Sequence, residues 1–348
     1  MFTVCMPDFA VTASRCQSGQ VKCDPAESFG NVLAQRRARA VSTVLNIGLI
    51  SVVLAVLLSV AFGSTALTSE TPTWLLPIAI IALALGVPHG AVDQLILRRP
   101  LTFHQFLLFA LGYVLVAGLA IAAIIAAPTP AFVVVLAGTA WHFGTGDVQA
   151  TAELQGTPPE KGLARVVLAL ALGAAPVLLP LTSPASASTL SLIEPKLSQL
   201  VTPSAVFVVR GAVFIVISVG VAILLRRRKH RAVLELLALT ALGCLASPLL
   251  AFAVYFGLWH AVRHTARLAQ HTYGFVSLQT FGFIFRRGIP SIIGFIVVVG
   301  ILVSRSSSLA SSGTLLWFGL AIVWGLTVPH MILVTAFDRR MRSVSGSS

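Results

Sequence analysis

Histidines within long apolar stretches are the residues of this sequence whose type and spacing best suit chemistry. The segment WHAVRH (259–264) holds two of them, His260 and His264, four residues apart. On a helix, residues four apart lie one turn above each other on the same face. An ionisable side chain inside a membrane is costly and is a functional candidate by default. We therefore predict that this pair belongs to a functional site.

Three more histidines occur in apolar surroundings, each in a short distinctive segment. They are His89 in GVPHGAVD (86–93), His142 in WHFGTGD (141–147) and His330 in TVPHM (327–331). Neutral imidazole is a good ligand for iron, copper and zinc. A shell of histidines without cysteine favours iron, because structural zinc usually recruits thiolates. A metal site follows only if the fold brings these segments together.

The composition predicts the fold class. Of 348 residues, 57% are hydrophobic and only 10% are charged, whereas soluble proteins carry about 25% charged residues. Apolar runs of roughly 20 residues then indicate an all-α, polytopic bundle of transmembrane helices. The net charge of +13 is not accompanied by a nucleic-acid-binding motif. About ten spans are expected, at 41–63, 72–97, 103–126, 130–146, 162–181, 204–226, 231–246, 248–270, 288–304 and 313–336.

The distribution of basic residues predicts the topology. With a cytoplasmic N-terminus, 21 of the 24 lysines and arginines fall on the inner side, as the positive-inside rule requires. We therefore expect both termini in the cytoplasm and a multi-pass protein of the cell inner membrane. A poorly ordered tail (1–35), one membrane catalytic domain (36–340) and a short tail (341–348) complete the organisation. Residues 182–203 are expected to form the longest external loop.

This topology places the five histidines of the apolar segments in one layer. All lie on even-numbered spans, towards the cytoplasmic ends, and His89 and His330 each precede a basic boundary by nine residues. At 1.5 Å per residue that is roughly 13 Å of helix. Taken singly, each could be a buried histidine bonded to a backbone carbonyl. As a group they predict a shared metal or cofactor site.

Two aspartates accompany these histidines. Asp93 follows His89 by four residues and could orient its imidazole, bind the metal directly or pair with a nearby arginine. Asp147 follows Gly144 and Gly146, which suggest the end of a span. It could cap the helix, orient a ligand or lie in a solvated loop.

Aromatic residues flank the histidine segments and admit two interpretations. They could pack in the core or line a slot for a long apolar substrate. They are Trp141, Phe143, Tyr255 and Trp259. Arg263 is expected to mark the cytoplasmic interface, and His104, His230 and His271 are expected at the membrane surface.

Together the segments GVPHGAVD, WHFGTGD, WHAVRH and TVPHM, in this order, resemble the Brp/Blh family of integral-membrane β-carotene 15,15′-dioxygenases. The resemblance covers residues from about 72 to 337. It implies cleavage of the central double bond of β-carotene by O₂ at Fe(II), giving two molecules of retinal. The implied ligands are His89, His142, His260 and His264. His330 would lie in the pocket or behind the ligands, with direct ligation left open.

The resemblance also implies partners. β-Carotene would enter from the membrane lipid, and retinal would leave the same way, with a microbial rhodopsin as a natural acceptor. Two functions of other classes stay open from the residues alone: a haem-binding membrane electron carrier, with histidines as axial ligands, and a histidine-rich metal transporter. Carotenoid preference, oligomeric state and the role of the N-terminal cysteines are left undecided.

Overall fold

The computed structural model describes residues 25–66, 90, 92–96, 101–305 and 312–345. These residues form helices and no strand, which confirms the all-α class. The α-helices are α2 (Pro25–Ala66), α4 (Phe103–Ala126), α5 (Pro128–Gln155), α6 (Gly162–Leu178), α7 (Ser186–Ile193), α8 (Pro203–Arg226), α9 (His230–Leu245), α10 (Pro248–Val254), α11 (Ala261–Tyr273), α12 (Leu278–Arg305) and α13 (Ser312–Ser345). Shorter elements are η1 (Asp93–Ile96), η2 (Pro180–Thr182), η3 (Pro195–Leu200) and the π-helical η4 (Tyr255–His260).

Four of the described helices are long and apolar enough to cross a membrane. They contribute residues 37–62 of α2, 103–126 of α4, 203–226 of α8 and 317–340 of α13. The protein is therefore a helical membrane protein, while the total of ten spans and the side of each terminus stay predictions. The expected span 72–97 lies outside the described residues, except for residue 90 and residues 92–96.

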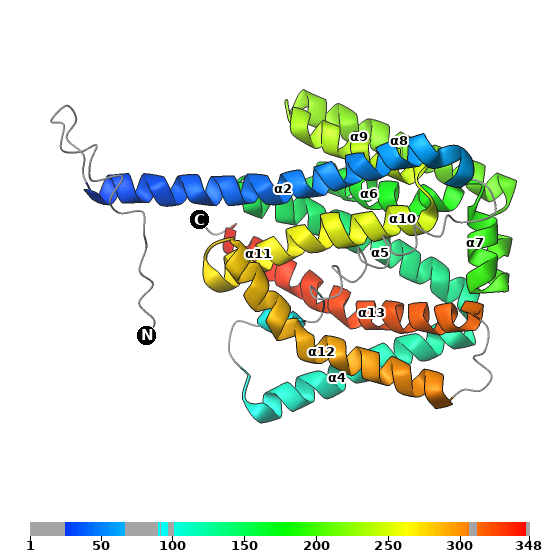
Figure 1. Ribbon diagram of the computed structural model, residues 1–348. Helices are drawn as coiled ribbons and strands as arrows, with labels where there is room; N and C mark the ends of the chain where they lie inside the picture. The colour runs from blue at the N-terminus through cyan, green and yellow to red at the C-terminus, as the bar shows by residue number, and fades with distance from the viewer. Residues whose placement is uncertain (1–24, 67–89, 91, 97–100, 306–311, 346–348) are drawn as a thin grey trace.

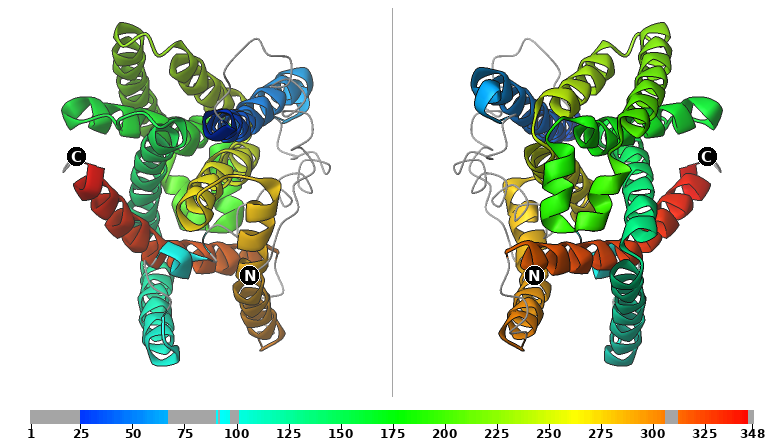
Figure 2. Two further views of the ribbon diagram at one scale, coloured as in Figure 1. Left: turned by 90° about the vertical axis from the view of Figure 1, so that its left-hand side faces the viewer. Right: turned by 90° about the vertical axis from the view of Figure 1, so that its right-hand side faces the viewer.

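The helices surround a central rod made of α10, η4 and α11 (Figure 1). Helix α2 lies along one side of this rod and α5 along another, while α12 and η1 contact α11. Helix α13 packs against α4, α5 and η1 (Figures 1 and 2). The central position of the rod explains why the histidines of WHAVRH are reached by side chains from several helices.

Two glycines allow α5 and α6 to cross at very short distance. A Cβ on Gly144 would lie 1.7 Å from the carbonyl oxygen of Ala169. A Cβ on Gly173 would lie 1.8 Å from the carbonyl oxygen of Ala140. Small residues let helix backbones approach in membrane proteins. This crossing fixes the position of α5, the helix that carries His142 and Asp147.

The structure corrects four sequence expectations about the elements. Helix α5 does not end at Gly144 or Gly146 but continues to Gln155, because glycine inside a helix is tolerated where packing is tight. Helix α2 already begins at Pro25, so residues 25–35 are helical and not an unstructured tail. The segment 182–203 contains α7 and η3 rather than only loop. The span expected at 248–270 is a composite of α10, η4 and α11.

Candidate metal centre

Four of the five predicted histidines meet at the centre of the described bundle. Their rings form a closed four-membered arrangement, in which each ring neighbours two others. The ring centroids are 5.5 Å apart for His142 and His260 and 6.2 Å apart for His260 and His264. They are 5.7 Å apart for His264 and His330 and 5.2 Å apart for His330 and His142. All four residues are buried, with 2–5% of each exposed.

These four histidines come from four elements, two of which, η4 and α11, are consecutive in the chain. His142 lies in the middle of α5, His330 lies in α13, and His260 and His264 lie at the junction of η4 and α11. Their sequence separation shows that only the tertiary fold can bring them together. The fifth predicted histidine, His89, lies outside the described residues.

Asp147 holds one side of this centre by three hydrogen bonds. Its Oδ2 accepts from the hydroxyl of Tyr255 and from Nε1 of Trp259, both at 2.8 Å. Its Oδ1 lies 3.1 Å from Nδ1 of His260. Asp147 is 2% exposed and lies inside α5, so it is neither a helix cap nor part of a solvated loop. Since a carboxylate only accepts hydrogen bonds, it keeps the proton on Nδ1 and leaves Nε2 for other contacts.

The π-helical segment η4 explains how three side chains reach one carboxylate. In a regular helix Trp259 lies on the same face as Tyr255, but His260 is turned away by about 140°. The wider π turn brings residues five apart closer to one face, which adds His260 to the pair. Gly146 leaves room for the ring, because a Cβ there would lie 3.2 Å from Cε1 of His260.

Asp93 holds the opposite side of the centre. Its Oδ1 lies 2.8 Å from Nδ1 of His330, and its Oδ2 accepts from the hydroxyl of Tyr113 at 3.0 Å. The same hydroxyl also lies 3.2 Å from the carbonyl oxygen of Leu326. Asp93 is 3% exposed. Among the described residues, the histidine that contacts Asp93 is thus His330, while the predicted contact of Asp93 with His89 involves a residue outside the described part of the chain.

Arg263 is buried and contacts the ring of Trp259, and its expected position at the cytoplasmic interface stays a prediction. Only 2% of it is exposed, and its guanidinium lies 3.7 Å from the centroid of the Trp259 ring. It donates to the hydroxyl of Thr151 at 3.1 Å and pairs with Glu235 at 3.1 Å. A buried arginine needs such partners, because an unpaired charge is very costly there. Arg263 therefore belongs to the interior frame of the centre.

Arg267, one turn further along α11, ties three helices together. It pairs with Glu153 of α5 and, at 2.7 Å, with Asp338 of α13, and 1% of it is exposed. His271 and Gln149 also contact the Glu153 carboxylate. Burial alone would raise the pKa of Glu153, but the hydrogen bonds from His271, Arg267 and Gln149 lower it to about 2. This ion-pair cluster holds the helices that carry His142, His264 and His330.

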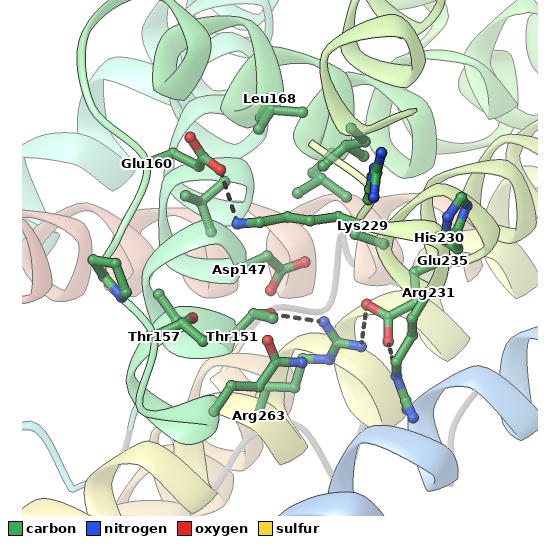
Figure 3. Close-up of a pocket in the computed structure, with 18 residues that line it drawn as sticks. Asp147, Thr151, Thr157, Glu160, Leu168, Lys229, His230, Arg231, Glu235 and Arg263 are labelled. Carbon is green, nitrogen blue, oxygen red and sulfur yellow. Dashed lines mark hydrogen bonds and ion pairs between the residues drawn. The ribbon is translucent and has the colours of Figure 1, made fainter. Parts of the chain in front are cut away.

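A cavity of about 460 Å³ extends to Asp147 and Arg263, two of the residues that support the histidine centre. Figure 3 shows Asp147 and Arg263 among the residues that line it, together with Glu160 and Lys229. Lys229 donates to Glu160 at 2.8 Å. Burial would raise the pKa of Glu160, but Lys229 and Arg227 hold it below its ordinary value. The cavity touches the carboxylate that orients His260, and none of the four histidine rings lines it.

Three of the four aromatic residues singled out in the sequence are buried near the centre, and the fourth is exposed. Phe143 is buried, and its ring centroid lies 4.4 Å from that of His260. Tyr255 and Trp259 are fully buried around Asp147, whereas Trp141 is 44% exposed and lies on the outside of α5. Three histidines outside this group, His104, His230 and His271, are exposed.

Sequence reasoning missed Tyr113, Glu235, Glu153 and Asp338, all of which support the centre. A signal existed for two of them, because Tyr113 and Glu235 are isolated polar residues within apolar segments.

The centre offers donors of a suitable type for a metal. Within the described part of the chain, no three His, Cys, Asp or Glu side chains are already arranged to hold a metal ion. With metal–nitrogen bonds of about 2.1 Å, two imidazoles at a tetrahedral angle have centroids roughly 5 Å apart. The neighbouring rings here are 5.2–6.2 Å apart. The centre is therefore a set of nitrogen donors of suitable type rather than a finished coordination shell.

The fold and the site define a helical membrane protein with a buried, carboxylate-supported histidine centre. Comparison with known families matches residues 80–338 to the family described as β-carotene 15,15′-dioxygenase. A curated relative from Halobacterium salinarum, named probable β-carotene 15,15′-dioxygenase Blh, is 30% identical over 295 residues, covering 76% of this chain and 84% of the relative. The chain belongs to the β-carotene 15,15′-dioxygenase family. No solved structure matches it.

Proposed function

We propose that this protein cleaves β-carotene at the central 15,15′ double bond with O₂, giving two molecules of all-trans-retinal at a non-haem Fe(II) centre. The observation that carries the proposal is the closed arrangement of four buried histidine rings in a chain of this family. The proposed ligands are His89, His142, His260 and His264. When bound, ferrous iron would supply the redox chemistry that O₂ needs to react with a closed-shell polyene.

The residues of the chain contribute orientation and exclusion of water. Asp147 holds Nδ1 of His260, so that Nε2 is the nitrogen available to a metal. Phe143 places an apolar ring against His260. Because all four rings are buried, bulk water is kept from the centre. Neutral imidazoles add no negative charge, which suits a site that accepts an apolar substrate.

The surroundings of the centre also favour an apolar substrate. β-Carotene has no polar group and partitions into the bilayer, and the chain places apolar helices such as α4 and α8 where lipid can contact them. We propose that the substrate enters from the membrane lipid and that retinal returns to it, for capture by a rhodopsin in the same membrane. The inner membrane of the cell is the proposed location.

The decisive experiment is expression in a bacterium that accumulates β-carotene. Loss of orange colour and appearance of retinal are expected, with one atom of ¹⁸O from labelled O₂ in each aldehyde. Purified protein should contain about one iron per chain and lose it when both His260 and His264 are replaced by alanine. Unchanged β-carotene beside folded, iron-loaded protein would rule out the proposed reaction, and a Soret band would indicate haem instead.

A further inference from the structure

Two units that share a tyrosine, an aspartate and a histidine lie on opposite sides of the histidine centre. In one, Asp147 accepts from the hydroxyl of Tyr255 at 2.8 Å and from Nδ1 of His260 at 3.1 Å. In the other, Asp93 accepts from the hydroxyl of Tyr113 at 3.0 Å and contacts Nδ1 of His330 at 2.8 Å. Each unit thus contains a tyrosine, a buried aspartate and a histidine bound through Nδ1, and the Asp147 unit also contains Trp259.

The two histidines of these units occupy equivalent corners of the four-ring arrangement. His260 neighbours His142 at 5.5 Å and His264 at 6.2 Å between ring centroids. His330 neighbours the same two rings, at 5.2 and 5.7 Å. His330 is therefore as close to the other rings as His260 is, although it comes from α13 and not from the rod.

The chemistry of the two histidines is also the same. A carboxylate on Nδ1 fixes the tautomer, orients the ring and raises the basicity of Nε2, as is usual for histidines that bind metals. Burying a carboxylate is expensive unless it is fully compensated. Asp93 is 3% exposed and Asp147 is 2% exposed. The fold therefore buries one carboxylate for each of the two histidines, despite the free-energy cost of doing so.

We propose that His330 is a direct metal ligand, equivalent to His260, and not a residue that merely lines the pocket. The inference rests on the proposed function, because it requires that the centre holds iron. Among the described residues, the ligands then include one carboxylate-anchored imidazole on each side, with His142 and His264 between them, and His89 stays a proposed ligand. Asp93 and Tyr113 become positioning residues that act through His330.

The test compares the affinity for Fe(II) of the wild type with that of His330→Gly, measured anaerobically in detergent. We expect the Kd of the variant to rise by more than about 100-fold. For Asp93→Asn, which alters only the support of the ligand, a smaller rise of about 10–100-fold is expected. His104→Gly, which removes an exposed histidine of α4 outside the centre, is the matched control and should bind as the wild type does.

Direct ligation is distinguished from support by chemical rescue. Imidazole added to His330→Gly should restore iron binding, and ¹⁵N-imidazole should change the nitrogen couplings in the pulsed EPR spectrum of the ferrous nitrosyl complex. Wild-type affinity in His330→Gly, or lost affinity without any coupling from the labelled imidazole, would overturn the proposal. Where His330→Gly does not yield folded protein, His330→Gln decides, because glutamine can still donate to Asp93. Unchanged affinity in that variant would equally refute ligation.

Failure of this inference can be separated from failure of the proposed function. A wild type that binds iron and produces retinal while His330→Gln keeps full iron affinity refutes only the role of His330. A folded wild type that binds no iron refutes both proposals.

Discussion

Nδ1 of His260 lies 3.1 Å from Oδ1 of Asp147, although the two residues are 113 positions apart in the chain. The contact joins the π-helical segment η4 to the middle of α5, and both residues are 2% exposed. It connects the two distinctive segments WHAVRH and WHFGTGD through a single carboxylate. The orientation of the His260 ring thus depends on a residue of another helix.

Replacing Asp147 by asparagine should weaken iron binding without unfolding the protein. Asparagine keeps the shape and can still accept from Tyr255 and Trp259, but it removes the charge that holds Nδ1–H of His260. We expect the Kd for Fe(II) to rise about 10–100-fold, measured by anaerobic titration. Glu160→Gln, which removes another carboxylate of the same cavity, is the control and should leave the Kd unchanged. Equal affinity in Asp147→Asn and the wild type would contradict the assigned role.

Gly144→Ala should destabilise the crossing of α5 and α6. The added Cβ would lie 1.7 Å from the backbone oxygen of Ala169, and backbone cannot move aside as a flexible side chain can. Overpacking of this kind costs roughly 1–3 kcal/mol or more, so thermal unfolding in detergent should occur at lower temperature. Gly112→Ala in α4 is the control, because nothing lies within 4 Å of the new methyl group. Similar stability of both variants would show that the helices can separate easily.

Arg263→Met alone should destabilise the protein more than Arg263→Met combined with Glu235→Leu. The single change leaves the buried carboxylate of Glu235 without Arg263, which costs roughly 3–5 kcal/mol for buried pairs. Arg263→Met combined with Glu235→Leu should recover part of the loss, although Arg231 then loses its own contact at 3.1 Å. Chemical unfolding of both single variants, the double variant and the wild type measures the coupling energy. Additive losses would mean that the pair is not coupled.

Stability should depend on pH through Glu153. The pKa of this residue falls from 4.5 to about 2 on folding, so the folded state binds fewer protons than the unfolded state between these values. The contribution is therefore present above pH 4.5 and is lost as the pH falls towards 2. Glu153→Gln should lower stability by about 1.5–3 kcal/mol above this range, and the difference in melting temperature should shrink in acid. A difference that stays constant as the pH falls would contradict the assignment.

Much of the helical framework could be predicted because long apolar runs and their caps determine it locally. The span expected at 103–126 coincides with α4, where Thr102 forms a capping box with Gln105. The meeting of His142, His260, His264 and His330 was also predicted, since positions along the spans place them at similar depth. The hydrogen bond between Asp93 and His330 and the ion pair between Arg267 and Asp338 were not predicted, because they join segments far apart in the chain.

Other features could not be predicted for identifiable physical reasons. Gly144 and Gly146 suggest the end of a helix by local propensity, but close packing against α6 overrides this preference. Arg263 and Arg267 resemble residues of a membrane interface, and only their ion pairs with Glu235, Glu153 and Asp338 reveal their interior role. Periodicity cannot detect the extra residue in η4, since the apolar pattern continues through it.

The π-helical segment η4 has a consequence for how this sequence should be aligned and engineered. One additional residue per turn acts as a fixed insertion, so the helix after His260 is rotated by about 100° from its uninterrupted course. The residues that share a face of α10 therefore predict the corresponding face of α11 only if the helical register is shifted by one residue. A designed chimera that joins related chains should therefore have its boundary outside Tyr255–His260, where both partners share a common frame.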